Sequence, residues 1–128
     1  MNCVRFKSDV TIVPSPGGAR IISALDQATQ KLGVDLIVTA GSNGQHSGPN
    51  DPHYRGDAYD VRSHDFDAIL KEKVIAVVMD LLGYDCFYGF IEAAGTDNEH
   101  YHIQVKKGTV YPPDPSSTNA DSGAGGNK

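Results

Sequence analysis

The stretch Tyr101-His102-Ile103-Gln104-Val105-Lys106 alternates strictly between apolar and polar side chains. This period of two residues is typical of a β-strand with one buried face, because successive side chains point to opposite sides of a sheet. The apolar members therefore share the face that packs on a core, while His102 and Gln104 share the other face. The segment predicts a sheet whose second face carries polar residues.

Three further segments are predicted as strands. Val34–Ala40 is a mostly apolar run, Ala58–Arg62 is a shorter candidate, and Cys86–Ile91 is rich in aromatic residues. Residues 4–13 can supply an additional edge strand. The segment 41–57 contains four glycines, two prolines and two histidines. A loop of that length inside a small domain is usually functional.

Two segments predict amphipathic helices. In residues 17–32 the apolar side chains recur at steps of three and four, Pro16 precedes the helix, and Gly33 is suited to end it. The second helix is predicted to begin after Ser63, as its N-cap, and to end at Gly83.

Composition and charge limit the class of protein. A length of 128 residues leaves room for one domain. Eleven Lys and Arg against sixteen Asp and Glu give a net charge of −5 without a basic cluster, so nucleic acid is not an expected partner. No window reaches the roughly 18 consecutive apolar residues of a membrane span. Charges interrupt Met1–Lys7, so no signal peptide is expected.

The predicted fold class is α+β, with two principal helices packed on a small, mainly antiparallel sheet. This domain is expected to occupy residues 1–111 and to be a monomer. Residues 112–128 consist largely of Pro, Ser, Asp, Gly and Asn and contain no large apolar side chain. Such a segment cannot bury enough surface to offset its ordering entropy, so a disordered C-terminal tail is predicted.

Four of the five histidines lie near two short stretches of the chain. The first stretch runs from His53 to Asp60 and contains Gly56, where the backbone can turn. A turn is required, because an unbroken strand would place His53 and Asp60 on opposite faces. The second stretch is Glu99-His100-Tyr101-His102. Imidazole and carboxylate groups suit zinc, so His53, Asp60 and either histidine of the second stretch predict a metal site.

The pattern His53-x-x-Gly56-x-Ala58-x-Asp60 resembles a signature of the zinc D-Ala-D-Ala carboxypeptidases and dipeptidases and their phage endolysin relatives, peptidase family M15. The pair His100-x-His102 resembles the second signature of the same superfamily, which also contains murein endopeptidases and the amino-terminal domain of hedgehog proteins. The resemblance covers roughly residues 34–107. It implies a hedgehog/D-Ala-D-Ala-peptidase-like fold.

The resemblance implies that His53, Asp60 and His102 bind Zn²⁺ and that the chain is a zinc metallopeptidase. The implied substrate is a peptidoglycan stem peptide, cut by a carboxypeptidase or by an endolysin-type endopeptidase that degrades the cell wall. A zinc-binding module without catalysis, as in hedgehog-like domains, is the first alternative. A structural zinc domain is another, and it requires His46 or His100 as a fourth ligand.

Catalytic roles also follow from the resemblance. Glu99 takes the place of the general base, and Glu92 at the end of the preceding aromatic strand is its rival. His100 stabilises the oxyanion or orients the substrate, or else only hydrogen-bonds the site.

The chain departs from the family after its first buried strand. Many members carry a Tyr-Arg pair there, whose arginine contacts the substrate, whereas residues 41–45 contain no cation. Arg62 or Arg55 can take that role, and His46 is a further candidate substrate-binding residue. Peptidoglycan lies outside the membrane and no export signal is evident. We therefore expect a protein that is cytoplasmic until released, or one that is associated with a phage or virion.

Overall fold

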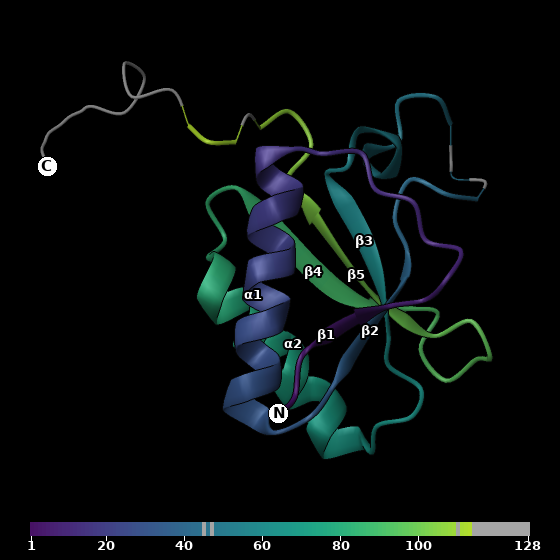
Figure 1. The fold of residues 1–128 in the computed structure, drawn as a ribbon, viewed down its shortest axis with the longest axis vertical. Coiled ribbons are helices and arrows are strands. Elements are labelled where there is room, and N and C mark those ends of the chain that lie inside the picture. The colour runs from purple at the N-terminus through teal and green to yellow at the C-terminus, as the bar shows by residue number, and fades with distance from the viewer. Residues whose placement is uncertain (45, 47, 110, 114–128) are drawn as a thin grey trace, which may run out of the picture.

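The computed structural model describes residues 1–44, 46, 48–109 and 111–113. The predicted disordered tail, 112–128, lies outside the described residues except for its first two. Figure 1 shows the arrangement of the elements, with both helices on one side of the sheet. In chain order they are β1 (Val4–Phe6), α1 (Pro16–Leu32), β2 (Leu36–Ala40), the 3-10 helix η1 (Pro52–Arg55), β3 (Ala58–Arg62), α2 (Ala68–Leu82), β4 (Phe87–Glu92) and β5 (His100–Val105).

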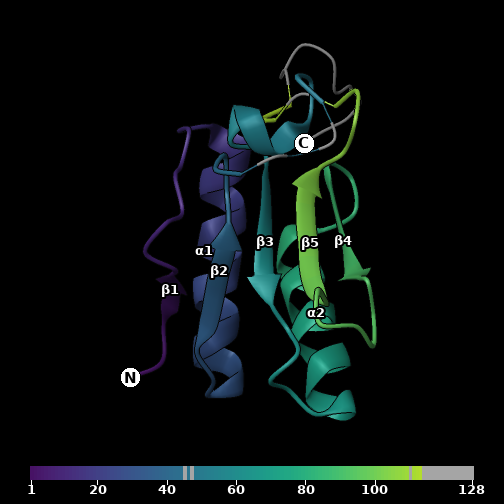
Figure 2. The ribbon, with the colours of Figure 1, turned by 90° about the vertical axis from the view of Figure 1, so that its right-hand side faces the viewer.

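The five strands form one sheet in the order β1-β2-β3-β5-β4 (Figure 2). β1 pairs with β2 in parallel, whereas the other three neighbouring pairs are antiparallel. The sheet is therefore mixed, and not the mainly antiparallel sheet that the sequence predicted. The reason is connectivity, because α1 carries the chain back along the sheet between β1 and β2, and such a crossover joins parallel neighbours. The α+β class itself is confirmed.

The first helix begins one residue before its predicted start, at Pro16, and ends at the predicted residue, Leu32. Ser15 is the N-cap, and its Oγ accepts a hydrogen bond from the Gly18 backbone N–H at 2.9 Å. Pro16 occupies the first turn, where its missing N–H costs nothing. Gly33 ends the helix in the left-handed conformation, with φ at 69°.

The second helix begins later than predicted. Its N-cap is Asp67, whose Oδ1 accepts a hydrogen bond from the Leu70 N–H at 2.8 Å. Ser63, the predicted cap, is buried and donates its hydroxyl to Glu99 at 2.6 Å. The hydroxyl of Ser63 is thus engaged in a tertiary hydrogen bond with Glu99 and does not cap the helix, which begins after Asp67 instead. No helix in the described part of the chain is long and apolar enough to cross a membrane.

Alternation along the strands gives the sheet two different faces. The face toward the helices carries the core side chains of the strands, which are Leu36, Val38, Tyr59, Val61, Phe87, Tyr101, Ile103 and Val105. Helix α1 covers them with Ile21 and Leu25, and α2 with Val74 and Val78. The intervening strand residues point to the opposite side, which is called the open face below. As predicted, His102 and Gln104 alternate with Tyr101, Ile103 and Val105 along β5, although Gln104 is itself buried.

Candidate metal centre

The first histidine motif places His53 on η1 and Asp60 on β3. Asp51 caps η1, because its Oδ1 accepts a hydrogen bond from the His53 backbone N–H at 2.9 Å. Gly56 ends η1 with φ at 80°, and a Cβ at this position would lie 1.8 Å from the carbonyl oxygen of Val13. This turn folds His53 back over the open face toward Asp60, as the sequence required.

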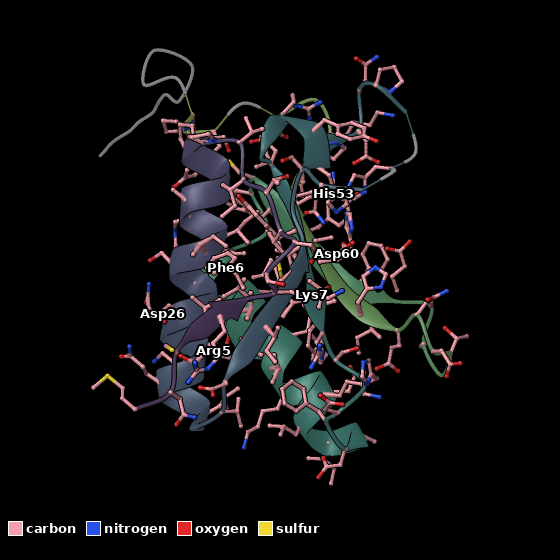
Figure 3. All side chains as sticks on the ribbon, turned by 45° about the vertical axis from the view of Figure 1, so that its right-hand side comes forward. Arg5, Phe6, Lys7, Asp26, His53 and Asp60 are labelled. Carbon is pink, nitrogen blue, oxygen red and sulfur yellow. The ribbon has the colours of Figure 1, made fainter. Side chains whose placement is uncertain are left out.

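The register of the sheet adds His102 to this pair. Asp60 and His102 are direct partners across β3 and β5. The Asp60 Oδ1 atom lies 3.1 Å from His53 Nε2 and 3.2 Å from His102 Nδ1. Figure 3 shows His53 and Asp60 close together on the side of the sheet away from α1. His102 therefore meets, on the open face, two residues that lie more than forty positions earlier in the sequence.

The other ring nitrogen of each histidine is occupied. His53 Nδ1 donates to Asp51 Oδ1 at 2.7 Å, and His102 Nε2 donates to Gln104 Oε1 at 2.7 Å. A neutral imidazole carries a proton on only one nitrogen. In the neutral form, His53 Nε2 and His102 Nδ1 therefore direct lone pairs at the Asp60 carboxylate, and in the protonated form the same nitrogens donate hydrogen bonds to it. Three electron-pair donors converge on one point, and only positive charge stabilises such an arrangement.

The pKa shifts of these groups have the same cause. Burial is the largest single influence on His53 and His102 and opposes their protonation, but hydrogen bonds and charge attraction, chiefly from Asp60, together outweigh it and raise the pKa of both imidazoles. Burial likewise opposes ionisation of Asp60, yet the hydrogen bonds from His102 and His53 hold the pKa of its carboxyl far below the usual range. Metal ions and protons therefore compete for the same lone pairs.

His53, Asp60 and His102 can together hold a metal ion, because one ligand atom from each lies within 4.8 Å of the other two. Within the described part of the chain, no fourth His, Cys, Asp or Glu joins this group. Neither of the candidate closing ligands, His46 or His100, completes it. A site with three protein ligands and an open position is characteristic of catalytic metal centres, whereas structural ones are closed.

Glu92 and His100 lie beside these ligands as direct partners across β4 and β5. His100 Nδ1 donates to the Asn98 carbonyl at 2.6 Å, which leaves His100 Nε2 3.1 Å from Glu92 Oε1 and 3.7 Å from Asp60 Oδ1. Glu92 Oε1 is also 3.7 Å from His102 Nδ1, and its side chain is 50% exposed. Glu92 is thus next to the ligands and open to solvent.

Glu99 has different surroundings. It is 5% exposed, and its carboxylate accepts hydrogen bonds from Ser63 Oγ at 2.6 Å, Lys71 Nζ at 3.0 Å and the Gly95 N–H at 3.1 Å. These bonds, with that of Ser63 the strongest influence, lower the pKa of Glu99 to about 2. Lys71 belongs to α2, on the covered side of the sheet. The structure therefore places Glu92 beside the candidate metal ligands, whereas the Glu99 carboxylate is held by Ser63, Lys71 and Gly95.

His46 and Arg62, the predicted substrate-binding residues, both border the centre. The His46 ring stacks on His53 with 3.8 Å between centroids and 3° between planes. Arg62 is the cross-strand partner of His100, and its guanidinium lies 3.7 Å from Asp65. His46 thus forms a wall beside one ligand, and Arg62 extends the open face beyond His100.

Two hollows flank the metal ligands along β5. The first has a volume of about 330 Å³ and is lined by His100 and Arg62 among others. The second, of about 580 Å³, is lined by Gln104 and Arg55 among others. His102 lies between His100 and Gln104 on the strand, so the candidate centre separates the two hollows.

Comparisons with known proteins give no family assignment. No family model, curated protein or solved structure matches this chain. The functional reading consequently depends on the chemistry and geometry of the centre, together with the two sequence motifs.

Sequence reasoning missed two residues of the centre, Asp51 and Gln104. Both bond the outward nitrogen of a ligand histidine, which fixes its tautomer and ring orientation. A signal existed for Gln104, because strand alternation puts it on the same face as His102. The position of Asp51 depends on the η1 turn, for which the glycine-rich segment gave no clear pattern.

Proposed function

We propose that this chain is a zinc-dependent peptidase. The supporting observation is the convergence of His53 Nε2, Asp60 Oδ1 and His102 Nδ1, each histidine being held by a hydrogen bond from its other nitrogen. A tetrahedral zinc ion with bonds of about 2.0–2.1 Å spaces its ligand atoms about 3.3 Å apart. The observed N···O separations of 3.1 and 3.2 Å fit that spacing. The M15-like motifs nominate the same three residues.

The zinc ion, when bound, supplies Lewis-acid chemistry by acidifying water and polarising the scissile carbonyl. Glu92 is the proposed general base in place of Glu99, because its carboxylate lies beside the ligands and is accessible to solvent. It accepts a proton from the attacking water and passes it to the departing amine. His100 can stabilise the developing oxyanion as the imidazolium, because its Nδ1–H is bonded to Asn98 and its Nε2, which faces Glu92 and Asp60, must then carry the second proton.

The hollows on both sides of the centre favour an endopeptidase over a carboxypeptidase. A peptide lying across the centre along β5 can place residues in the hollow at His100 and in the hollow at Gln104. A carboxypeptidase needs space for a single residue beyond the scissile bond. Each hollow is lined by two cations, Arg62 and Lys7 in one and Arg55 and Lys107 in the other, which are suited to carboxylates carried by the substrate.

The proposed substrate is a peptidoglycan stem peptide, and this part of the proposal rests on the resemblance to M15 enzymes. The same resemblance assigns the α+β fold to the hedgehog and D-Ala-D-Ala peptidase class. A role in cell-wall degradation places the active protein outside the bacterial membrane, after release from the cytoplasm or as part of a phage particle.

Metal analysis combined with muropeptide digestion tests the proposal. The purified chain is expected to bind one zinc per molecule and to cut muropeptides at an internal bond, including peptides with an amidated carboxyl terminus, as read by mass spectrometry. Intact muropeptides in the presence of bound zinc would support the non-catalytic binding module. Release of a single terminal residue from free carboxyl ends alone would support a carboxypeptidase.

Two matched variants separate the candidate bases. Glu92→Gln should fold and retain zinc, but its turnover rate should fall by about 10²–10⁴-fold, which is the usual contribution of a general base. Glu99→Gln should keep its turnover per folded molecule. If Glu99→Gln loses turnover and Glu92→Gln does not, Glu99 is the general base. Loss of zinc in Glu92→Gln would instead identify Glu92 as a metal ligand.

A further inference from the structure

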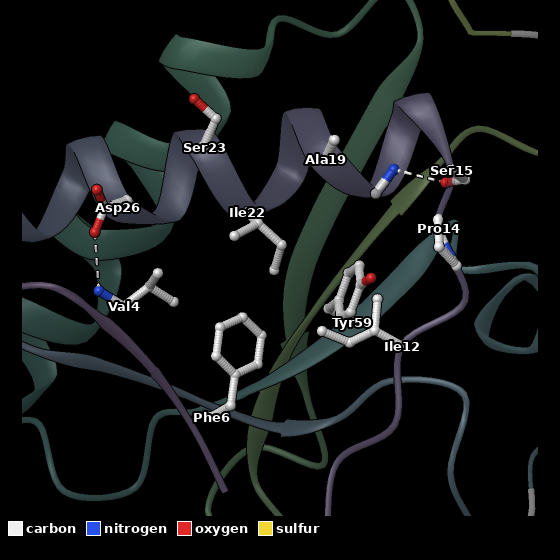
Figure 4. Close-up of a pocket in the computed structure, with 11 residues that line it drawn as sticks. Val4, Phe6, Ile12, Pro14, Ser15, Ala19, Ile22, Ser23, Asp26 and Tyr59 are labelled. Carbon is white, nitrogen blue, oxygen red and sulfur yellow. Dashed lines mark hydrogen bonds between the residues drawn. The ribbon is translucent and has the colours of Figure 1, made fainter.

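A third hollow, called the α1 hollow here, lies between β1, the segment leading into α1, and α1 itself (Figure 4). Its volume is about 600 Å³, within the roughly 300–1,000 Å³ typical of sites for small organic molecules. Its walls are mostly apolar and include Phe6, Ile12, Ala19 and Ile22. Phe6 and Ile12 are 41% and 49% exposed, so apolar surface remains uncovered at the mouth of the hollow.

Four polar residues line this mostly apolar space, which are Ser15, Ser23, Asp26 and Tyr59. Tyr59 lines the hollow from β3 and is only 1% exposed, and its hydroxyl makes no hydrogen bond with any residue that the structure describes. Tyr101 on β5 is equally buried, but its hydroxyl donates to the Lys71 carbonyl at 2.8 Å. Buried polar groups are nearly always paired, because an unpaired one has lost its water without replacement. The Tyr59 hydroxyl therefore lacks a hydrogen-bond acceptor, and a bound ligand can supply one.

The charges around the hollow indicate which kind of ligand can bind there. A tyrosine hydroxyl carries its proton at neutral pH and can donate it to an acceptor oxygen. Asp26 lines the hollow and accepts the Val4 N–H, and Asp57 accepts the Ser15 hydroxyl behind it. The Asp26 carboxylate in the wall of the hollow disfavours an anionic ligand.

We infer that the α1 hollow binds a neutral, mainly apolar small molecule whose single acceptor oxygen, an amide or ester carbonyl, receives the Tyr59 O–H. Tyr59 and Asp60 are consecutive on β3 and point to opposite faces of the sheet. The α1 hollow is thus separate from the metal centre, and the inference does not depend on the proposed peptidase activity.

An NMR titration with decanamide, a neutral ten-carbon amide, tests the inference on the whole chain. Saturable shifts are expected at Phe6, Ile22 and Tyr59. Ala19→Phe fills the hollow from an exposed helix position and should weaken binding at least tenfold. Gln30→Phe adds the same ring at an exposed position of α1 outside the hollow, and should bind like the parent chain. Absence of saturable binding, or equal binding by Ala19→Phe, would overturn the inference.

A second pair of variants tests the hydroxyl itself. Tyr59→Phe should weaken decanamide binding about fivefold, as expected for one lost hydrogen bond. The same change should not lower the melting temperature of the free protein, whereas Tyr101→Phe should, because only Tyr101 has a protein partner. An equal decrease in melting temperature in both variants would show that the Tyr59 hydroxyl already has a hydrogen-bond partner in the protein, and would contradict the proposed ligand contact.

Discussion

At the residue scale, the arrangement of the candidate ligands depends on neighbours that do not touch the metal position. Asp51 accepts the Nδ1–H of His53 and so directs the Nε2 lone pair toward Asp60. Carboxylates in this outer position orient the imidazole and make it a stronger electron-pair donor.

Replacing Asp51 by Asn removes the charge but keeps an oxygen that can cap η1. Asp51→Asn should therefore fold normally and lower zinc affinity by roughly 10–100-fold. Competition against a chromophoric chelator measures this affinity. Asp97→Asn, at an exposed aspartate, is the matched control and should leave affinity unchanged. Equal affinities in the two variants would contradict the orienting role of Asp51.

The lowered pKa of Glu99 leads us to expect that the stability of the fold depends on pH. Its folded-state pKa is lowered to about 2 from an ordinary value of 4.5. A carboxyl with a depressed pKa stabilises the fold above the ordinary value, and this stabilisation is lost as the pH falls toward the folded-state value. Glu99→Gln should thus be less stable than the parent chain at pH 7 in urea denaturation.

The stability difference caused by Glu99→Gln should narrow below pH 4.5 and nearly vanish near pH 2. Glu72→Gln, at an exposed glutamate of α2, should show no comparable pH-dependent difference. A gap between Glu99→Gln and the parent that stays constant from pH 7 to pH 3 would mean that the carboxylate bonds to Ser63 and Lys71 are not formed in solution.

At the element scale, the junction of η1 and β3 determines whether His53 reaches the open face. Gly56 has φ at 80° and approaches the Val13 carbonyl so closely that a Cβ would lie 1.8 Å from its oxygen. Gly33 has a similar φ of 69°, but a Cβ there would meet nothing within 4 Å. Alanine substitutions at these two glycines therefore distinguish the energetic cost of backbone strain from that of a steric clash.

Gly33→Ala should cost about 1–2 kcal/mol of unfolding free energy, the usual cost of a left-handed alanine. Gly56→Ala adds a backbone clash and should cost about 3 kcal/mol or more. Because the clash displaces η1, this variant should also bind zinc more weakly. Chemical denaturation with parallel zinc titration measures both effects. Similar losses in the two variants would show that the Val13 contact can relax.

At the scale of the whole molecule, the candidate ligands connect η1, β3 and β5. A ligand that binds only the folded chain stabilises it, by about 4 kcal/mol at a free concentration of 1,000 times its Kd. Zinc should therefore raise the melting temperature on the order of 10 °C, and a chelator should reverse the rise. Asp60→Asn should abolish the zinc-dependent shift in a calorimetric scan. A shift that persists in this variant would place the zinc elsewhere.

Much of the local structure was predictable because its causes are local. Ser15, Pro16 and Gly33 specify the ends of α1 through capping and backbone preference. The observed β3, Ala58–Arg62, has the predicted bounds, and β5 differs from its prediction by one residue at each end. Exceptions arise where a long-range contact competes, as when Ser63 bonds Glu99 and ceases to act as a cap.

The face of β5 that packs on the core and the residues competent to bind a metal were predictable from the chain alone, because both follow from side-chain chemistry and a period of two. The parallel pairing of β1 with β2, the position of Glu92 beside the candidate ligands and the bond between Glu99 and Lys71 became evident only in the folded structure. Those outcomes depend on which strands pair and in what register. Such pairings are set by the packing of the whole core, and no single segment of the chain encodes them.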